Sequence, residues 1–338
     1  MIKVGFIGAG RITTAHLNAL KELKEMFLPV AVADPVEDNA KNIAKDFCIP
    51  NTYIDYKEML DRERLDLVVV AAPNGLHYRI SRDVLERGIN VLVEKPLALS
   101  YKESKSLVDI AESKKLFLGV VLQKRLLPLY KNLKSALDEV KFGKIFLIHL
   151  SLRWSRSKEY FANSWRGTRD MDGGLIFNQA IHDIDILDYL FSIREIFAYG
   201  GTFIHQIETE DNIVGVFKTK SGAIGSFEFT ISLNEKNMGE VIEVFGEKSR
   251  FIYGIGEYEK LTTIQDFLNL SNKDISISKE PTLNGTGHKF VYEEVAKAIK
   301  NADESPISGK NVLHSILVAE GILNSIRTNE RVVLEEGI

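Results

Sequence analysis

The chain has 338 residues, 45% of them hydrophobic, and a formal net charge of −4. This length predicts two domains, and the near-neutral charge excludes nucleic-acid binding by bulk electrostatics. The single cysteine, Cys48, excludes an intramolecular disulfide and a cysteine metal cluster, which favours a reducing cytoplasm. The N-terminus lacks a signal-peptide pattern and no apolar run reaches about 18 residues, so we expect no membrane span.

The first 120 residues alternate short apolar runs with amphipathic segments. The runs predict buried strands, because near-continuous Val, Ile and Leu are typical of parallel strands covered on both faces. The expected strands are Ile2–Ile7, Val30–Ala33, Leu67–Ala71, Val91–Val93 and Phe117–Leu122. The expected helices are Thr13–Leu23, Glu37–Phe47, Leu76–Arg87 and Tyr101–Ser113. This alternation predicts a doubly wound α/β domain over residues 1–122.

The pattern changes after residue 122. A helix is expected over Leu127–Val140, a long strand over Ile145–Trp154, a loop over Ser155–Gly173 and a helix over Leu175–Phe191. Strand-like sequence then extends from Phe197 to Tyr253, and the tail predicts helices over Phe290–Ile299 and Val312–Ser325. We therefore expect residues 123–338 to form an α+β domain with a large, mostly antiparallel open sheet.

A glycine pair follows the first strand. Gly8 permits a tight turn, and Gly10 lets the backbone approach a pyrophosphate at the N-terminus of the next helix. Arg11 and Ile12 open that helix and are further candidates for cofactor contact. Thr13 stands where the dinucleotide fingerprint has a third glycine, so the pattern is incomplete. The location, at the start of a βαβ unit, favours a Rossmann dinucleotide site over a plain tight turn.

Asp34 ends the second strand, 24 residues after Gly10. A carboxylate in this place accepts hydrogen bonds from the adenosine ribose and repels a 2′-phosphate, which favours NAD over NADP. The alternative is an Asp that only starts a turn with Pro35.

The segment NVLVEKP, residues 90–96, ends an apolar strand with two opposite charges and a proline. Ligands of an open parallel sheet bind outside the carboxyl ends of its strands, where Lys95 is expected. A partly desolvated lysine can exchange a hydrogen bond or a proton with a substrate hydroxyl, and Pro96 fixes the backbone beside it. A solvated lysine at a strand end is the alternative.

Four motifs in this order resemble the glucose–fructose oxidoreductase, inositol dehydrogenase and MocA (Gfo/Idh/MocA) family. They are the glycine pair, AAPNGLH at 71–77, EKP at 94–96 and WRGTRDMDGGLIFNQAIHDIDIL at 165–187. The resemblance covers nearly the whole chain and implies an NAD(P)-dependent oxidoreductase acting on sugars, inositols or related compounds. It also implies a homo-dimer or homo-tetramer that associates through the exposed face of the second-domain sheet.

The resemblance further implies site residues. Lys95 would be the catalytic lysine, Pro96 would carry a cis peptide bond and His182 would be the general acid/base. The implied cofactor contacts are Ala72, Asn74, His77, Glu94, Trp165 and Arg166. Many members carry Asp in place of Asn178, and an Asn can orient a hydroxyl but cannot act as a base.

Helical geometry independently groups three polar residues near 180. Asn178, His182 and Asp185 follow at spacings of four and three, so they share one face of a helix. The core face would hold Ile176, Ala180, Ile184 and Leu187. A buried unpaired polar group costs about 1–3 kcal/mol, so this stripe indicates a site unless it simply faces solvent. Asp183 faces away and no second His follows at four residues, so we expect no metal.

The segment from Val121 to Asp170 holds eleven Lys and Arg against four Asp and Glu, a net charge of +7. Its loop alternates arginines with aromatics, and these side chains suit carboxylates, phosphates and sugar rings. Arg153, Tyr160 and Arg169 are therefore substrate candidates, together with Asn178 and Asp185. An anionic sugar, such as a uronic acid or a nucleotide-linked sugar, is one interpretation. A role in cofactor-pyrophosphate and subunit contacts is the other.

These features predict an NAD-dependent oxidoreductase that moves a hydride between a secondary alcohol of a sugar-type substrate and nicotinamide. In this mechanism His182 takes the hydroxyl proton and Lys95 stabilises the developing oxyanion. Two alternatives stay open. One is a hydrolase, epimerase or dehydratase that oxidises its sugar transiently with retained NAD. The other is a nucleotide-sensing regulator without turnover.

Overall fold

The computed structural model describes residues 1–162, 164–264, 268–271, 274, 286–301 and 304–335. The chain forms two compact units. The first comprises Met1–Leu127 and Glu280–Leu313, and the second comprises Pro128–Lys279 and His314–Ile338.

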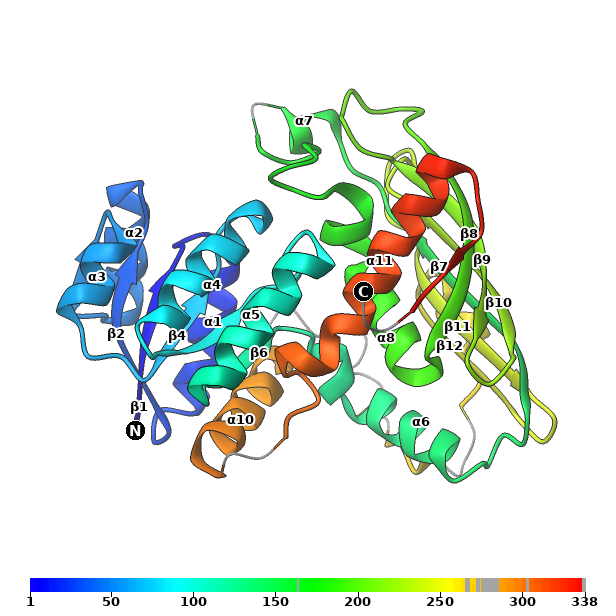
Figure 1. The fold of residues 1–338 in the computed structure, drawn as a ribbon, viewed down its shortest axis with the longest axis horizontal. Coiled ribbons are helices and arrows are strands. Elements are labelled where there is room, and N and C mark those ends of the chain that lie inside the picture. The colour runs from blue at the N-terminus through cyan, green and yellow to red at the C-terminus, as the bar shows by residue number, and fades with distance from the viewer. Residues whose placement is uncertain (163, 265–267, 272–273, 275–285, 302–303, 336–338) are drawn as a thin grey trace. The chain divides into compact units, whose positions relative to one another are not determined.

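The first unit is built on a six-stranded parallel sheet with the order β3-β2-β1-β4-β5-β6 (Figure 1). Its strands are β1 (Ile2–Ile7), β2 (Phe27–Ala33), β3 (Asn51–Tyr53), β4 (Leu67–Val70), β5 (Asn90–Val93) and β6 (Leu118–Val120). Every residue of β4 is buried, as expected for a strand covered on both faces. This strand order is that of a doubly wound dinucleotide-binding sheet, which confirms the predicted fold class.

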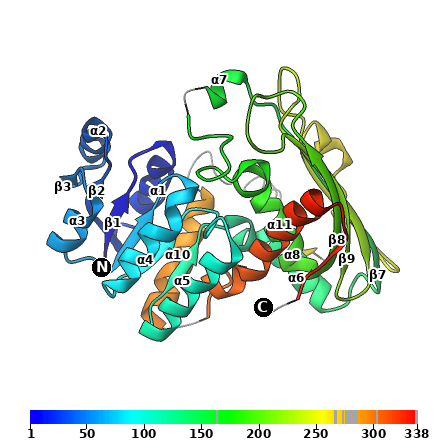
Figure 2. The same cartoon turned by 45° about the horizontal axis from the view of Figure 1, so that its top comes forward.

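Helices connect and cover these strands. They are α1 (Arg11–Glu22), α2 (Glu37–Phe47), α3 (Tyr56–Arg62), α4 (His77–Glu86), α5 (Tyr101–Lys114) and α10 (Thr286–Asn301). Two short 3-10 turns, η1 (Asn74–Leu76) and η2 (Gln123–Leu126), follow β4 and β6. Helix α4 lies beside α5, and α1 packs against α10 (Figure 2). The hydrophobic core runs between the sheet and these helices.

Helix α10 corrects the expected boundary between domains. We expected residues 123–338 to form one domain, but residues 123–127 and 286–313 belong to the first unit. The reason is the packing of Tyr292, whose ring lies 5.2 Å from that of Phe27 and 5.7 Å from that of His16. An amphipathic helix does not encode in its own sequence which sheet it will cover.

The second unit holds a seven-stranded sheet with the order β12-β11-β7-β10-β9-β8-β13. Its strands are β7 (Ile145–Arg153), β8 (Ile193–Gly201), β9 (Asn212–Thr219), β10 (Ile224–Thr230), β11 (Gly239–Gly246), β12 (Arg250–Gly256) and β13 (Val332–Val333). Among the described strands of this sheet, only β7 and β10 pair in parallel, so the prediction of a mostly antiparallel sheet is confirmed.

Helices α8 (Ile181–Phe191) and α11 (Gly309–Thr328) lie along one face of this sheet (Figure 1). The described part of this unit also contains α6 (Pro128–Asp138), α7 (Lys158–Phe161), the π-helical turn η3 (Leu175–Ala180) and the 3-10 turn η4 (Glu257–Leu261). Strand β9 alternates buried and exposed residues, which is typical of a strand with one face packed on the core, and no helix of the described residues is seen to cover its other face. No described helix is long and apolar enough to cross a membrane.

Candidate active site

The glycine loop after β1 has two different steric demands. Gly8 has φ +103°, and a Cβ there would lie 2.3 Å from the carbonyl oxygen of Ala71. Gly10 is the N-cap of α1, and a Cβ there would meet nothing within 4 Å. Gly8 is therefore required by the fold, whereas the space at Gly10 is open. Open space over free N–H groups at a helix N-terminus fits a dinucleotide pyrophosphate.

Thr13 occupies the place of the third fingerprint glycine. Its side chain is fully buried, and its hydroxyl donates a hydrogen bond to the carbonyl oxygen of Gly8 at 2.8 Å. The departure from the fingerprint is thus compensated by a bond that ties α1 to the glycine loop. At the start of the helix Arg11 is exposed and Ile12 is partly buried.

Asp34 lies at the end of β2 beside the same loop. One carboxylate oxygen accepts the backbone N–H of Ala9 at 2.8 Å, and the other accepts that of Val36 at 2.9 Å. The side chain is partly exposed, so it can also meet a ribose. Both interpretations of Asp34 are therefore compatible: it organises its turn and also presents a carboxylate at the expected place.

The turn after β4 holds the residues implied to lie near the nicotinamide. Ala72 is partly buried and Asn74 is buried at the start of η1. His77 is fully buried, with Nδ1 2.6 Å from the carbonyl oxygen of Pro96 and Nε2 2.9 Å from that of Ala72. Burial lowers the pKa of His77 in spite of these carbonyls, so the ring carries one proton. We assign this proton to Nδ1, which makes the shorter contact with the carbonyl oxygen of Pro96. His77 therefore contacts backbone carbonyl groups in this structure.

Lys95 follows β5 at the carboxyl edge of the sheet and is partly buried. The Lys95–Pro96 peptide bond is cis, which confirms the expectation from the resemblance. Glu94 still belongs to the sheet ladder, because its N–H donates to the carbonyl oxygen of Val70 at 2.9 Å.

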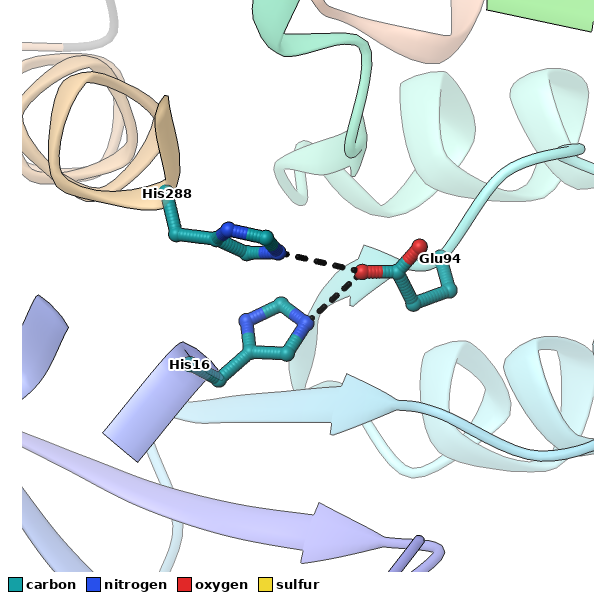
Figure 3. Close-up of side chains that lie close together, drawn as sticks. All are labelled: His16, Glu94 and His288. Carbon is teal, nitrogen blue, oxygen red and sulfur yellow. Dashed lines mark hydrogen bonds and ion pairs between the residues drawn. The ribbon is translucent and has the colours of Figure 1, made fainter. Parts of the chain in front are cut away.

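Glu94 has the buried partners that sequence reasoning could not name (Figure 3). Its Oε1 lies 2.9 Å from Nε2 of His16 and 3.5 Å from Nε2 of His288. Burial alone would raise the pKa of Glu94, but the two imidazoles outweigh it and hold that pKa well below its usual range. Burial lowers the pKa of His16, so a neutral His16 donates to an ionised Glu94. Nδ1 of His16 then accepts from the hydroxyl of Tyr292 at 3.0 Å.

In the second unit, a π-helical turn precedes α8 and includes Asn178. The amide of Asn178 donates to Oδ1 of Asp172, whose Oδ2 accepts the N–H of Gly167 at 2.8 Å. Asp172 is buried and links Gly167 to Asn178 in the π-helical turn before α8. The sequence pattern predicts neither the π turn nor the role of Asp172, although π turns are frequent at functional sites.

The three polar residues expected on one face have different surroundings. His182 is partly buried at the second position of α8. Asp185 is buried and accepts the hydroxyl of Ser315 on α11 at 2.8 Å. Because its carboxylate bonds inside the fold, we no longer count Asp185 among the substrate residues. The expected core residues Ile176, Ala180, Ile184 and Leu187 are all buried, as predicted.

The basic and aromatic loop brings two arginines to one tyrosine. The guanidinium of Arg156 lies 5.4 Å from the ring centre of Tyr160 and 4.6 Å from that of Trp154. The guanidinium of Arg166 lies 4.8 Å from the Tyr160 ring and 5.1 Å from that of Trp165. Burial lowers the pKa of Arg156, although an arginine stays charged at neutral pH. Within the described residues, no carboxylate forms an ion pair with Arg156 or Arg166.

Arg153 and Arg169 bind other groups of the protein. Arg153 forms an ion pair with Glu228 and a hydrogen bond with Tyr258, on the sheet face opposite the buried Leu152. The guanidinium of Arg169 donates to the carbonyl oxygen of Glu208 at 2.7 Å. Arg153 points to the sheet face that α8 does not cover, so we no longer propose it as a substrate residue.

Comparison with known proteins follows the same division of the chain. Residues 2–122 match the Gfo/Idh/MocA oxidoreductase family with its NAD-binding Rossmann fold, and residues 130–252 match the C-terminal domain of that family. The chain belongs to the Gfo/Idh/MocA family. It is an oxidoreductase of this family with an NAD-binding domain, which confirms the predicted class of enzyme and its cofactor.

Three similar proteins illustrate the range of this family. Levoglucosan dehydrogenase of Pseudarthrobacter phenanthrenivorans is 25% identical over 78% of this chain and 75% of its own length. Myo-inositol 2-dehydrogenase of Thermotoga maritima is 24% identical over the whole of both chains. The structure of the WlbA dehydrogenase from Bordetella pertussis, in complex with NADH and UDP-GlcNAcA, has a TM-score of 0.90 at 28% identity. It covers 99% of this chain and 98% of its own.

Proposed function

We propose that the substrate is an anionic sugar, specifically a uronic acid linked to a nucleotide, and that one of its secondary hydroxyls is oxidised. The observation that carries this proposal is the arginine pair around Tyr160, Arg156 and Arg166, which has no carboxylate partner among the described residues. An arginine fork matches a carboxylate or a phosphate, and an aromatic ring stacks on a sugar or base. Similarity to a WlbA structure that contains UDP-GlcNAcA supports the same substrate class.

The catalytic roles follow from residue chemistry. His182 removes the proton of the reacting hydroxyl, since an imidazole titrates near neutrality. Lys95 donates a hydrogen bond to the same oxygen and stabilises the negative charge that develops there. The Gly8–Gly10 loop would hold the pyrophosphate of NAD, and the bound cofactor would supply the hydride acceptor. Asn178 orients the substrate and leaves proton transfer to His182, because an amide is no base.

Two alanine variants test these roles. Lys95→Ala and His182→Ala should each lower kcat by orders of magnitude, about 10²–10⁴-fold for the proton-transfer residue. Both should leave the dissociation constant for NAD nearly unchanged, as measured by fluorescence titration. Near-full activity in either variant would remove that residue from the mechanism.

The substrate class is tested by steady-state kinetics on nucleotide-linked uronates, free uronates and neutral polyols. Arg156→Ala should lower kcat/KM for the nucleotide-linked uronate about 10- to 100-fold, since a hydrogen bond to a charged group contributes about 1.5–3 kcal/mol. Arg169→Ala is the control, because its guanidinium donates to a backbone carbonyl. A higher KM for NAD instead of the sugar would show that the loop serves the cofactor. Faster turnover of neutral polyols than of any uronate would refute the proposal.

A second candidate is transient oxidation with retained NAD. It is favoured by similarity to the 2,7-anhydro-N-acetylneuraminate hydratase of Mediterraneibacter gnavus, which is 28% identical over 64% of this chain and 56% of its own length. NAD that stays bound through purification, with product formed but no net NADH, would support this candidate. Stoichiometric NADH release would exclude it.

We propose that a second copy of the chain binds the exposed face of the seven-stranded sheet. Tyr199, Val214, Val216 and Ile224 share this face and are each more than half exposed, at 54–59%. Burying such side chains against a copy contributes about 25 cal/mol per Å² of apolar surface. Light scattering should give a dimer or tetramer mass for the native protein and a lower mass for Val216→Lys. An unchanged mass in that variant would place the interface elsewhere.

The reducing cytoplasm is the proposed setting. Cys48, the single cysteine of the chain, is exposed and free. An exposed free thiol persists under reducing conditions and forms intermolecular disulfides under oxidising ones. Fluorescence of a tagged protein in living cells would locate it.

A further inference from the structure

Lys95 follows a residue that is held from two sides in the interior of the first unit. The Glu94 carboxylate lies 2.9 Å from His16 on α1 and 3.5 Å from His288 in the first turn of α10. Both imidazoles are fully buried, and Figure 3 shows them converging on the same carboxylate oxygen. Among the described residues neither nitrogen of His288 makes a geometrically formed hydrogen bond, and the contact of its Nε2 with Glu94 is an ion-pair distance of 3.5 Å. His288 therefore packs against the carboxylate that His16 hydrogen-bonds.

Lys95 also precedes a residue that is held by a buried histidine. The carbonyl oxygen of Pro96 lies 2.6 Å from Nδ1 of His77, and the opposite edge of that ring faces the carbonyl oxygen of Ala72 at 2.9 Å. His77 is fully buried at the start of α4. The two residues that flank Lys95 are thus each fixed by imidazole contacts, while the lysine itself is only partly buried.

The distance between His16 and Glu94 favours a hydrogen bond over shared ligation of a metal ion in the His16–Glu94–His288 cluster. The three ligand atoms lie within 4.8 Å of one another, and two His with one carboxylate is a known ligand set. Ligand atoms about 2.0–2.1 Å from a tetrahedral metal would lie about 3.3 Å apart. The 2.9 Å between His16 and Glu94 is instead an ordinary N–H···O length. Metal content is nevertheless measured in the test below.

We propose that His16, His77 and His288 are positioning residues for Lys95. They hold Glu94 and Pro96 in place, so the lysine between them has one location at the carboxyl edge of the sheet. A reacting group displaced by about 1 Å can lose about 10²-fold in rate, which is why such anchoring would matter. The proposal rests on the catalytic role of Lys95 proposed above.

Paired amide substitutions test this inference with matched controls. Gln places its amide N–H near the position of a histidine Nε2, and Asn places it near Nδ1. His16→Gln and His288→Gln should therefore keep kcat within about threefold, while His16→Asn and His288→Asn should lower it about 10- to 100-fold. For His77 we expect the opposite order, because its shorter contact is made by Nδ1: His77→Asn should keep kcat and His77→Gln should lower it. Affinity for NAD should stay within about threefold in the His16 and His288 variants.

His314→Leu is the control for the loss of a partly buried His–carboxylate contact elsewhere. His314 lies 2.8 Å from Asp188 in the second unit, and its loss should lower the thermal midpoint without changing kcat. A purely structural role for the three histidines predicts the same behaviour for them: lower midpoints and unchanged kcat in every folded variant. That result would overturn the proposal. If one variant does not fold, the pairs at the other two histidines test the same statement.

Two further measurements separate the possible failures. Stoichiometric transition metal in the purified protein, lost in Glu94→Gln, would replace the hydrogen-bonded cluster with a metal site. Inactive Lys95→Ala together with fully active Asn and Gln variants would sink the positioning role and leave the proposed function intact. Full activity of Lys95→Ala would remove Lys95 from the mechanism and end the positioning role with it, since no catalytic lysine would remain to be positioned.

Discussion

Exchange of the two loop glycines for alanine separates a structural role from a cofactor role. In Gly8→Ala the new Cβ would lie 2.3 Å from the Ala71 carbonyl oxygen at φ +103°. Overpacking costs about 1–3 kcal/mol and the left-handed conformation about 1–2 kcal/mol, so the total is about 2–5 kcal/mol. In Gly10→Ala the Cβ meets open space at φ −83°, so the protein without cofactor should lose less than about 1 kcal/mol.

The affinity for NAD should distinguish the same two variants in the opposite order, with the larger loss in Gly10→Ala. The Cβ of Gly10→Ala would fill the space through which the pyrophosphate approaches the helix, at a cost of about 1–3 kcal/mol or about 5- to 150-fold in Kd. Thermal unfolding without NAD and fluorescence titration with NAD measure the two effects. An unchanged midpoint in Gly8→Ala would refute the steric argument, and unchanged NAD affinity in Gly10→Ala would refute the location of the pyrophosphate.

Three further predictions concern Asp34, Thr13 and Asp211. Asp34→Asn should lower the preference for NAD over NADP by at least about tenfold in kcat/KM, because the charge that repels a 2′-phosphate is lost; an unchanged ratio would leave Asp34 a turn residue only. Thr13→Val should destabilise the protein by about 1–3 kcal/mol, because the Gly8 carbonyl loses its donor inside the fold; chemical denaturation checks this. Burial raises the pKa of Asp211, but backbone N–H groups of residues 203–205 outweigh it and lower that pKa to about 2. This stabilisation, on the order of 2 kcal/mol, should be present above pH 4 and lost between pH 4 and 2, and Asp211→Asn should flatten that dependence.

The first sheet shows how far hydrophobic patterning reaches. Strand β1 and helix α2 were predicted with the bounds that the structure has, because continuous apolar runs and amphipathic periods are local properties. Strand β3 and helix α3 were missed. Strand β3 has three residues and none is fully buried, so it offers no periodicity to detect.

Prediction of the polar site residues has the same limit, since it depends on residues near one another in the chain. The location of Lys95 at a strand end could be predicted, since a strand run followed by a charge and a proline is visible in one segment. The spacing of Asn178, His182 and Asp185 suggested one polar face. The π turn alters the register at Asn178, and Asp185 bonds to Ser315, which is 130 residues away along the chain.

The sequence by itself determined the class of fold, the glycine turn, the catalytic lysine candidate and the family, because each depends on residues near one another in the chain. Only the tertiary structure decided what holds Glu94. Its partners, His16 and His288, lie 78 residues before it and 194 residues after it. A buried carboxylate needs such partners to stay ionised, but nothing local to EKP specifies which helices supply them. Packing of α1 and α10 brings both histidines to the end of β5, and this packing is a property of the folded chain.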